Sequence, residues 1–195
     1  MNIVLEDRGL NGVGVIRYAV VETAWGYAGI VGQGDLLLQG VLPEADEQGV
    51  VCKMKSHHRD LVRDDGFLPE VQQVLRDYFL GIESSVPIRV GIVWAGAFGQ
   101  SVLRQLVGVR VGQTVTYGRL SSLAGRAGAA RAVGSVMRRN PTPLLVPCHR
   151  VIRGDGQLGG YSAEGGTDVK KRLLDHERTM VTSKNIFIAP CNVDY

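Results

Sequence analysis

The chain has 195 residues, 45% of them apolar, and a formal net charge of +3. This length fits one large or two small globular domains with a buried core, and the mild charge by itself indicates neither nucleic acid nor membrane binding. Three scattered cysteines, Cys52, Cys148 and Cys191, make neither a disulfide framework nor a CxxC metal pattern. No run is apolar enough for a membrane span or a signal peptide, so we expect a cytoplasmic protein.

The first half of the chain predicts a small antiparallel sheet with a helix packed on it. Apolar, β-branched runs separated by glycine-containing turns predict strands over 13–21, 25–31 and 35–42. Apolar residues at helical spacing follow Pro69 and end at Gly81, which predicts an amphipathic helix.

Residues 83–89, which include Pro87, indicate a linker. We therefore divide the chain into an N-terminal domain, 1–90, a C-terminal domain, 91–177, and a tail, 178–195, to which the sequence assigns no role.

A basic cluster lies between the predicted strands and the first helix. It consists of Lys53, Lys55, His57, His58 and Arg59. Adjacent histidines can bind a metal, but without a nearby set of cysteines or carboxylates they are more often solvated. We predict no metal site.

The second half predicts three helices before the cysteine-containing segment. The first covers 98–107, and Thr116 is suited to cap a second that starts at Tyr117 and ends at Gly125. A third covers 129–139 and stops before Pro141.

The second and third helices, joined by a short glycine-containing turn, fit a helix-turn-helix, although an ordinary αα-hairpin is the commoner arrangement. Small residues in the third helix would let its backbone approach a groove, and arginines would reach phosphates. The small residues are Ala129, Ala130, Gly134 and Ser135; the arginines are Arg131, Arg138 and Arg139. With Arg126, Arg150 and Arg153 they make a local basic excess that indicates a phosphate-facing surface.

Cys148 follows an apolar run, 144–146, between prolines that predict a short rigid strand ending in a turn. Neighbouring cations such as His149 and Arg150 favour the reactive thiolate. Consecutive side chains of a strand point to opposite faces, so contact between Cys148 and His149 requires a turn or a bridging water. The alternative is a cysteine that serves only as a small buried apolar residue.

A glycine-rich loop with Tyr161 and Ser162 follows and is suited to hold a flat ligand. A final helix is expected over 168–177, with Lys170 and its neighbours outward. The apolar residues 186–188 beyond it have no assigned purpose.

Taken together, residues 140–152 closely resemble the active-site signature of the O6-alkylguanine-DNA alkyltransferases. Tyr117-Gly118 and residues 129–134 resemble that family's helix-turn-helix, and residues 159–162 and 173–177 resemble its substrate loop and last helix. The resemblance covers about 98–177. It implies an α/β (α+β) fold, with a ribonuclease-H-like N-terminal sheet domain and a mostly helical C-terminal domain.

The resemblance implies direct DNA repair. The alkyl group of O6-alkylguanine, and of O4-alkylthymine, would pass irreversibly to a cysteine after the base is flipped from double-stranded DNA approached through the minor groove. The protein would act once and need no cofactor or metal. It would be a monomer, with clustering along DNA left open.

The resemblance also assigns roles by position. Cys148 would be the nucleophile, His149 its base through a water, Glu177 the residue that orients His149, and Asn140 the residue that orders the turn. The flipped base would be bound by Tyr161, Ser162, Val151 and Met137, and Tyr117 would donate a proton to it and contact the phosphates. Arg131 would fill the place of the base in the stack. The residues that face the groove would be Ala129, Ala130, Gly134 and Ser135.

Two departures from the family pattern concern the substrate loop and the N-terminus. Ala163 stands where the family has the first glycine of Tyr-Ser-Gly-Gly, and Glu164 belongs to an apparent two-residue insertion, so the width of the pocket is open. Cys52 is the only cysteine in the first half, so the zinc ligands of some members are absent. Two rival functions remain: a lesion-binding protein, which would lack the cysteine, and a thiol hydrolase, which needs a base in direct reach of sulfur.

Overall fold

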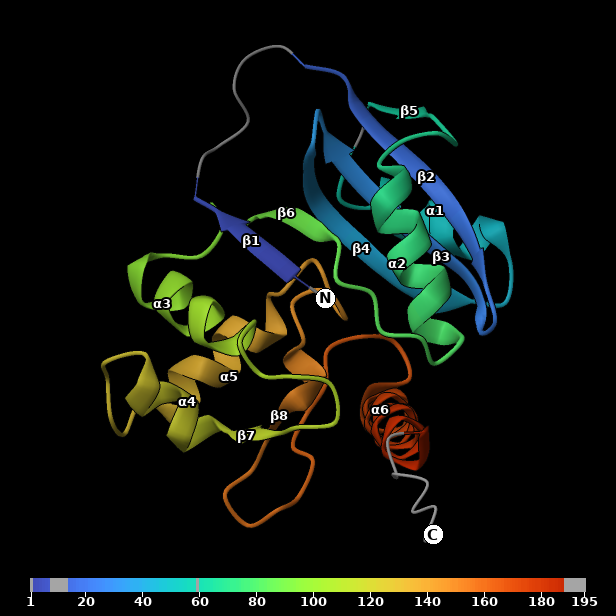
Figure 1. Ribbon diagram of the computed structural model, residues 1–195. Helices are drawn as coiled ribbons and strands as arrows, with labels where there is room; N and C mark the ends of the chain where they lie inside the picture. Colours follow the sequence, from blue (N-terminus) through green and yellow to red (C-terminus); the bar gives the residue numbers. More distant parts are fainter. Residues whose placement is uncertain (1, 8–13, 59, 188–195) are drawn as a thin grey trace, which may run out of the picture.

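A computed structural model describes residues 2–7, 14–58 and 60–187, with side chains through 182. Its six-stranded sheet has the order β1-β6-β4-β3-β2-β5 (Figure 1). The strands are β1 (Asn2–Glu6), β2 (Ile16–Thr23), β3 (Gly26–Gln33), β4 (Leu36–Glu44), β5 (Leu61–Arg63) and β6 (Pro87–Gly91). The antiparallel pairing of β2, β3 and β4 confirms the three predicted strands. Parallel pairs, β1 with β6, β4 with β6 and β2 with β5, make the whole sheet mixed.

Two helices cover opposite faces of this sheet: α1 (Glu47–Lys55), which was not predicted, and α2 (Pro69–Phe79), which was. Alternation along the strands sends Tyr18 toward α1 and Ala19 into the main core with α2. Gly29 on β3 lets α1 approach closely, because a Cβ there would lie 2.5 Å from Cγ1 of Val50. The polar appearance of the segment around α1 concealed a helix with only one buried side.

The interpretation of residues 83–89 as a linker is wrong for its second half, which belongs to β6. Ile88 and Val90 are buried, and Arg89 between them bonds Glu6 of β1 through Nε at 3.1 Å. The strand is short and begins with Pro87, so its alternation is evident only when its partners β1 and β4 are known. Residue 90 therefore falls within a strand, and the division into domains stays a prediction.

The C-terminal half consists of short helices beside β1 and β6 (Figure 1). It contains α3 (Ala97–Leu106), α4 (Tyr117–Leu123), α5 (Ala130–Arg138) and a two-stranded parallel sheet of β7 (Val115–Thr116) and β8 (Val151–Ile152). Thr116 caps α4 as predicted, since its Oγ1 accepts from the backbone N–H of Arg119 at 3.1 Å. One apolar core runs from the α2 face of the sheet through these helices.

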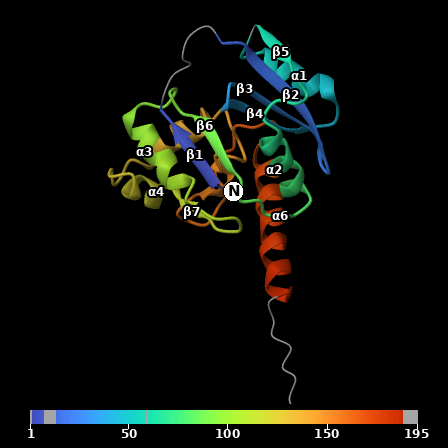
Figure 2. The same ribbon diagram turned by 45° about the horizontal axis from the view of Figure 1, so that its top comes forward.

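The last helix, α6 (Gly166–Phe187), is longer than the predicted 168–177 and continues through much of the predicted tail (Figure 2). Met180 on this added part is buried. The side chains of residues 186–188 and residue Arg59 of the basic cluster lie outside what the structure describes.

The predicted strand over residues 144–146 is also wrong. Leu144 has a φ of 73°, and the N–H of Val146 bonds the carbonyl of Thr142 at 2.9 Å, so this run is a tight turn. Proline restricts its own φ and that of its predecessor, but hydrogen bonds within the segment decide the path here. Cys148 consequently starts a short 3₁₀-helix, η1 (Cys148–Arg150), instead of ending a strand.

Candidate active site

The thiol of Cys148 is held at the start of η1 by the side chain of Asn140. Asn140 Nδ2 donates to Cys148 Sγ at 3.2 Å and to the carbonyl of Val146 at 2.9 Å. Its Oδ1 accepts from the backbone N–H of Thr142 at 3.1 Å, which fixes the amide orientation. Asn140 thus orders the turn and positions the sulfur.

The electrostatic environment of Cys148 combines opposing effects. The residue is only 4% exposed, and burial raises the pKa of its thiol because a thiolate is poorly solvated there. The hydrogen bond from Asn140 and the positive charge of Lys170 act in the opposite direction and lower that pKa. The thiol is therefore protonated at rest and needs a base to react.

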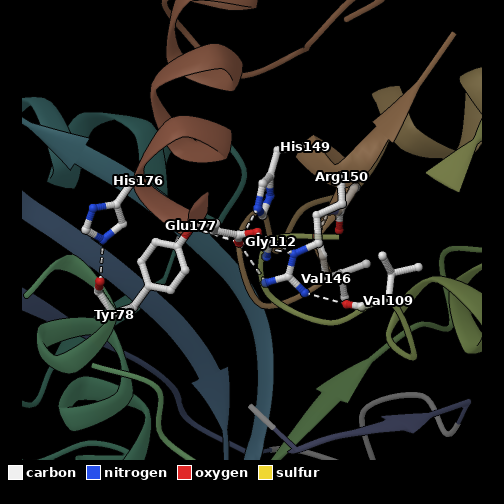
Figure 3. Close-up of polar contacts among 9 residues, drawn as sticks. Tyr78, Val109, Gly112, Val146, His149, Arg150, His176 and Glu177 are labelled. Carbon is white, nitrogen blue, oxygen red and sulfur yellow. Dashed lines mark hydrogen bonds and ion pairs between the residues drawn. The ribbon is translucent and has the colours of Figure 1, made fainter. Parts of the chain in front are cut away.

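The carboxylate of Glu177 on α6 is a buried hub that joins four segments (Figure 3). Its Oε1 accepts from His149 Nε2 at 2.8 Å, Arg150 Nη2 at 2.7 Å and the hydroxyl of Tyr78 at 3.0 Å. Its Oε2 accepts from the N–H of Gly112 at 3.0 Å. Burial alone would raise the pKa of Glu177, but the hydrogen bonds from His149 and Arg150 and the positive charge of Arg150 lower it to about 2.

The ionised carboxylate determines which nitrogen of His149 is free. Burial lowers the pKa of His149, against the opposing effect of Glu177, so the ring is neutral near pH 7. Because an ionised carboxylate only accepts, Nε2 must carry the proton. Nδ1 then has a free lone pair, and it is buried with no hydrogen-bond partner among the described residues.

Lys170 lies inside the site, which corrects the expectation that it points outward. The residue is fully buried, and its ammonium donates to the carbonyls of Val151, at 2.6 Å, and Leu158. Burial lowers the pKa of Lys170 to about 8, while Cys148 has the opposite effect. The carbonyl that accepts from Lys170 at 2.6 Å belongs to Val151, one of the residues predicted to bind the base.

A pocket of about 300 Å³ opens beside the thiol. The predicted residues Tyr117, Met137, Tyr161 and Ser162 all contribute to its wall. Its full lining is Tyr117, Gly134, Met137, Arg138, Cys148, Gly160, Tyr161 and Ser162. Gly134 lies beside the Tyr117 ring, and a Cβ at this position would be 4.0 Å from that ring, an ordinary contact distance.

The outer face of α5 carries the residues predicted to meet DNA. Arg131 and Ser135 are exposed, and Ala129 and Ala130 at the helix start are half-buried. The prediction that Arg150 belongs to the phosphate-facing arginines is wrong. Arg150 is 5% exposed, and its guanidinium donates to the carboxylate of Glu177 and, at 2.6 Å, to the carbonyl of Val109.

The sequence did not predict two residues that contact the site, Tyr78 and Lys170. Tyr78 belongs to α2, ninety-nine positions before its partner Glu177, so no local pattern indicates it. Lys170 sits one helical turn before Leu173 and Leu174, both buried, and this spacing is the signal that it faces inward.

Among the residues that the structure describes, no group of three or more histidines, cysteines and acids could hold a metal ion. Within the same residues, no helix is long and apolar enough to cross a membrane.

Sequence comparisons link this site to known proteins. Residues 97–179 match the family described as 6-O-methylguanine DNA methyltransferase, DNA binding domain. The chain is 54% identical over 82 residues to the methylated-DNA–protein-cysteine methyltransferase of Mus musculus, which is 42% of this chain and 38% of that protein. The chain thus spans about two fifths of the mouse relative's length. It is 35% identical over 151 residues to the protein of the same name from Methanosarcina acetivorans, covering 74% of this chain and 92% of the relative.

Solved structures show the same fold. Mycobacterium tuberculosis O6-methylguanine methyltransferase superposes with a TM-score of 0.71 at 28% identity, covering 92% of this chain and 98% of that one. A structure of the M. tuberculosis protein in complex with DNA gives the same score and identity over 84% and 94% of the two chains. These neighbours confirm a sheet-containing N-terminal part followed by a helical C-terminal part.

Proposed function

Because the chain belongs to the methylated-DNA–protein-cysteine methyltransferase family, we propose that it repairs DNA by taking the alkyl group of O6-alkylguanine onto Cys148. The observation that carries this proposal is the arrangement around the thiol: a sulfur bonded by Asn140 forms part of a small pocket, and the next residue is a neutral histidine with a free buried nitrogen. O4-alkylthymine, which the sequence resemblance implies as a further substrate, is part of the same proposal.

The reaction begins with transfer of the thiol proton of Cys148 through a water to Nδ1 of His149. The resulting thiolate attacks the alkyl carbon, the new S–C bond forms as the C–O6 bond breaks, and the electron pair leaves with the guanine. Burial raises the pKa of Tyr117, so its hydroxyl keeps its proton at neutral pH and can donate it to the leaving base. A thioether has no good leaving group, so each molecule acts once and needs no cofactor or metal.

Entry of the base requires that it leave the duplex, because Cys148 is only 4% exposed and lines a pocket. At about 300 Å³ the pocket is at the small end for ligand sites and suits one base. Tyr161 and Ser162 would bind the base, Val151 and Met137 complete its surroundings, and Arg131 on α5 would fill the gap in the stack. Ala129, Ala130, Gly134 and Ser135 would allow α5 to lie in the minor groove.

We further propose that the protein is a cytoplasmic monomer that acts without a membrane. Binding measurements on longer DNA would show whether it clusters along the duplex. The thiol hydrolase alternative is disfavoured by the hydrogen bonding of the thiol. Such an enzyme needs its base bonded to sulfur, whereas the amide of Asn140, which donates to Cys148 Sγ at 3.2 Å, cannot accept a proton.

Intact-mass spectrometry after mixing the protein with a duplex that contains O6-methylguanine tests the proposal. We expect a gain of one methyl group on Cys148, no transfer by Cys148→Ser, and normal transfer by the controls Cys52→Ser and Cys191→Ser. A methyl group on either of those two cysteines in the unaltered protein, or no mass gain, would contradict the assignment.

A further inference from the structure

Residues 159–165 carry two of the side chains proposed to bind the base, Tyr161 and Ser162. Both lie in the wall of the 300 Å³ pocket beside Cys148. From 160 to 162, however, the backbone makes no hydrogen bond to another described residue. A segment with few backbone hydrogen bonds opens easily, so its position depends on side-chain contacts. A contact at one end of the segment can therefore decide where Tyr161 and Ser162 lie.

The apparent insertion in this segment supplies such a contact, an ion pair with the N-terminal half of the chain. The carboxylate of Glu164 pairs with the ammonium of Lys53 on α1. Lys53 also pairs with Glu44 at the end of β4, so one cation joins two carboxylates. Burial lowers the pKa of Lys53, but its hydrogen bonds to Glu164 and Glu44 outweigh this effect and raise it. Lys53 is therefore charged at neutral pH, and three segments meet at its ammonium.

A tight turn fixes the backbone that carries Glu164. The N–H of Gly166 donates to the carbonyl of Ala163 at 2.9 Å and closes the turn. Gly165 has a φ of 81°, and a Cβ at this position would collide with the side chain of Val169 on α6. The turn is thus packed against the start of α6, and Glu164 is presented from a fixed position.

The ion pair lies where packing gives the segment little support. A cavity of about 820 Å³ is lined on one side by β4 and the end of α1 and on the other by residues 161–164. Lys53, Glu44 and Glu164 all belong to its wall. Open space offers no atoms for van der Waals contact, so the residues on its wall lose that part of their support. The Lys53–Glu164 pair joins the two sides across this space.

We infer that Lys53 and Glu164 are positioning residues, whose ion pair holds the segment 159–165 so that Tyr161 and Ser162 can bind the target base. The inference rests on the proposed function and gives the insertion a role. Neither residue lines the 300 Å³ pocket, so both act through the segment. An exposed ion pair contributes modestly, which corresponds to about a two- to fivefold effect on affinity for the base. High salt screens exposed charges and should remove that effect.

Reaction with free O6-methylguanine base tests the inference, because it excludes the salt dependence of DNA binding. Single-turnover rates at increasing base concentration, followed by intact-mass spectrometry, separate an apparent Kd from a limiting rate. At low salt, Glu164→Gln and Lys53→Met should each raise the apparent Kd by about two- to fivefold and leave the limiting rate unchanged. The difference should disappear in about 1 M salt. The double variant should lose no more than either single variant, because both remove one interaction.

Two controls and a second readout complete the test. Lys53→Arg keeps the charge and should retain the affinity of the unaltered protein. Glu47→Gln removes another exposed carboxylate of α1, which pairs with Arg63, and should change neither constant. Cleavage by chymotrypsin after Tyr161, identified by mass, does not depend on the reaction. It should be faster in Glu164→Gln and Lys53→Met, because the segment opens more often.

The possible failures are distinguishable. An unchanged apparent Kd in Glu164→Gln overturns the inference, and so does a loss that persists in about 1 M salt or that adds up in the double variant. Absence of transfer to the unaltered protein from both the free base and a methylated duplex overturns the proposed function. The chymotrypsin rates still decide whether the pair holds the segment, and equal cleavage of all the proteins would show that it does not.

Discussion

The surroundings of Glu177 and of Cys148 differ in how fully their buried polar atoms are hydrogen-bonded. Glu177 accepts hydrogen bonds from four residues on three other segments. Next to Cys148, by contrast, the buried Nδ1 of His149 has no hydrogen-bond partner among the described residues. His149 belongs to both groups, through Nε2 and Nδ1 respectively. The fully hydrogen-bonded carboxylate of Glu177 holds its segments together, whereas the free Nδ1 of His149 is the atom that the proposed reaction uses as a base.

The largest expected effect on the hydrogen-bonded residues around Glu177 is a loss of stability in the variant Glu177→Gln. The variant leaves the buried Arg150 without a compensating charge, and breaking a buried ion pair costs about 3–5 kcal/mol in the free energy of unfolding. Urea denaturation measures the loss. Asp175→Asn, which removes an exposed pair with Arg178, is the control and should change stability by less than about 1 kcal/mol. Similar losses in both variants would contradict the special role of the hub.

Lowering the pH should remove the difference in the free energy of unfolding between Glu177→Gln and the unaltered protein. The pKa of Glu177 is about 2 in the folded protein and about 4.3 when unfolded, so its contribution is complete above the unfolded value. That contribution, about 3 kcal/mol, is lost as the pH falls from about 4 through about 2. Urea titrations of both proteins at several pH values should show the gap closing over this window. A gap that stays constant down to pH 2 would mean that Glu177 does not titrate there.

The residue shared by the two regions is tested with His149→Gln. This side chain can still donate to Glu177 but offers no basic nitrogen, so stability should change less than in Glu177→Gln. The rate of methyl transfer should fall by roughly 10²-fold, the lower end for loss of a general base. Binding to methylated duplex, measured by fluorescence anisotropy, should be unchanged. Full activity in this variant would remove His149 from the reaction.

The smallest expected effect concerns the exposed face of α5. Arg131→Ala should slow repair of duplex DNA by about tenfold, because an inserted side chain offsets part of the few kcal/mol that unstacking a base costs. Reaction with the free O6-alkylguanine base should be nearly unaffected. Arg17→Ala, an exposed arginine on β2, serves as the control. Equal slowing with both substrates would show that Arg131 acts elsewhere.

Features determined by neighbouring residues were predicted well from the sequence. The cap by Thr116, the end of α4 before Gly125 and the end of α5 before Asn140 and Pro141 are confirmed, because each depends on local backbone chemistry. The family resemblance also identified four residues that the structure joins in two hydrogen-bonded pairs, Asn140 with Cys148 and His149 with Glu177.

Features determined by distant partners were not predicted. The strands β1 and β6 are recognisable only as a pair, and Tyr78 reaches Glu177 from α2. Arg150 looked like a surface cation because only the fold brings it to a buried carboxylate. The tight turn at Leu144 likewise depends on Asn140 side-chain bonds that proline rules do not describe.

The pairing of β1 with β6 has a consequence for biosynthesis. Asn2 pairs with Pro87, and Glu6 with Gly91, so each residue of β1 lacks its partner on β6 until 85 further residues have been synthesised (87 − 2 = 85 and 91 − 6 = 85). The hairpins β2–β3 and β3–β4 join neighbouring segments and can form much earlier. Strand β1 thus docks later than these hairpins, and it forms the edge of the sheet that lies beside the C-terminal helices.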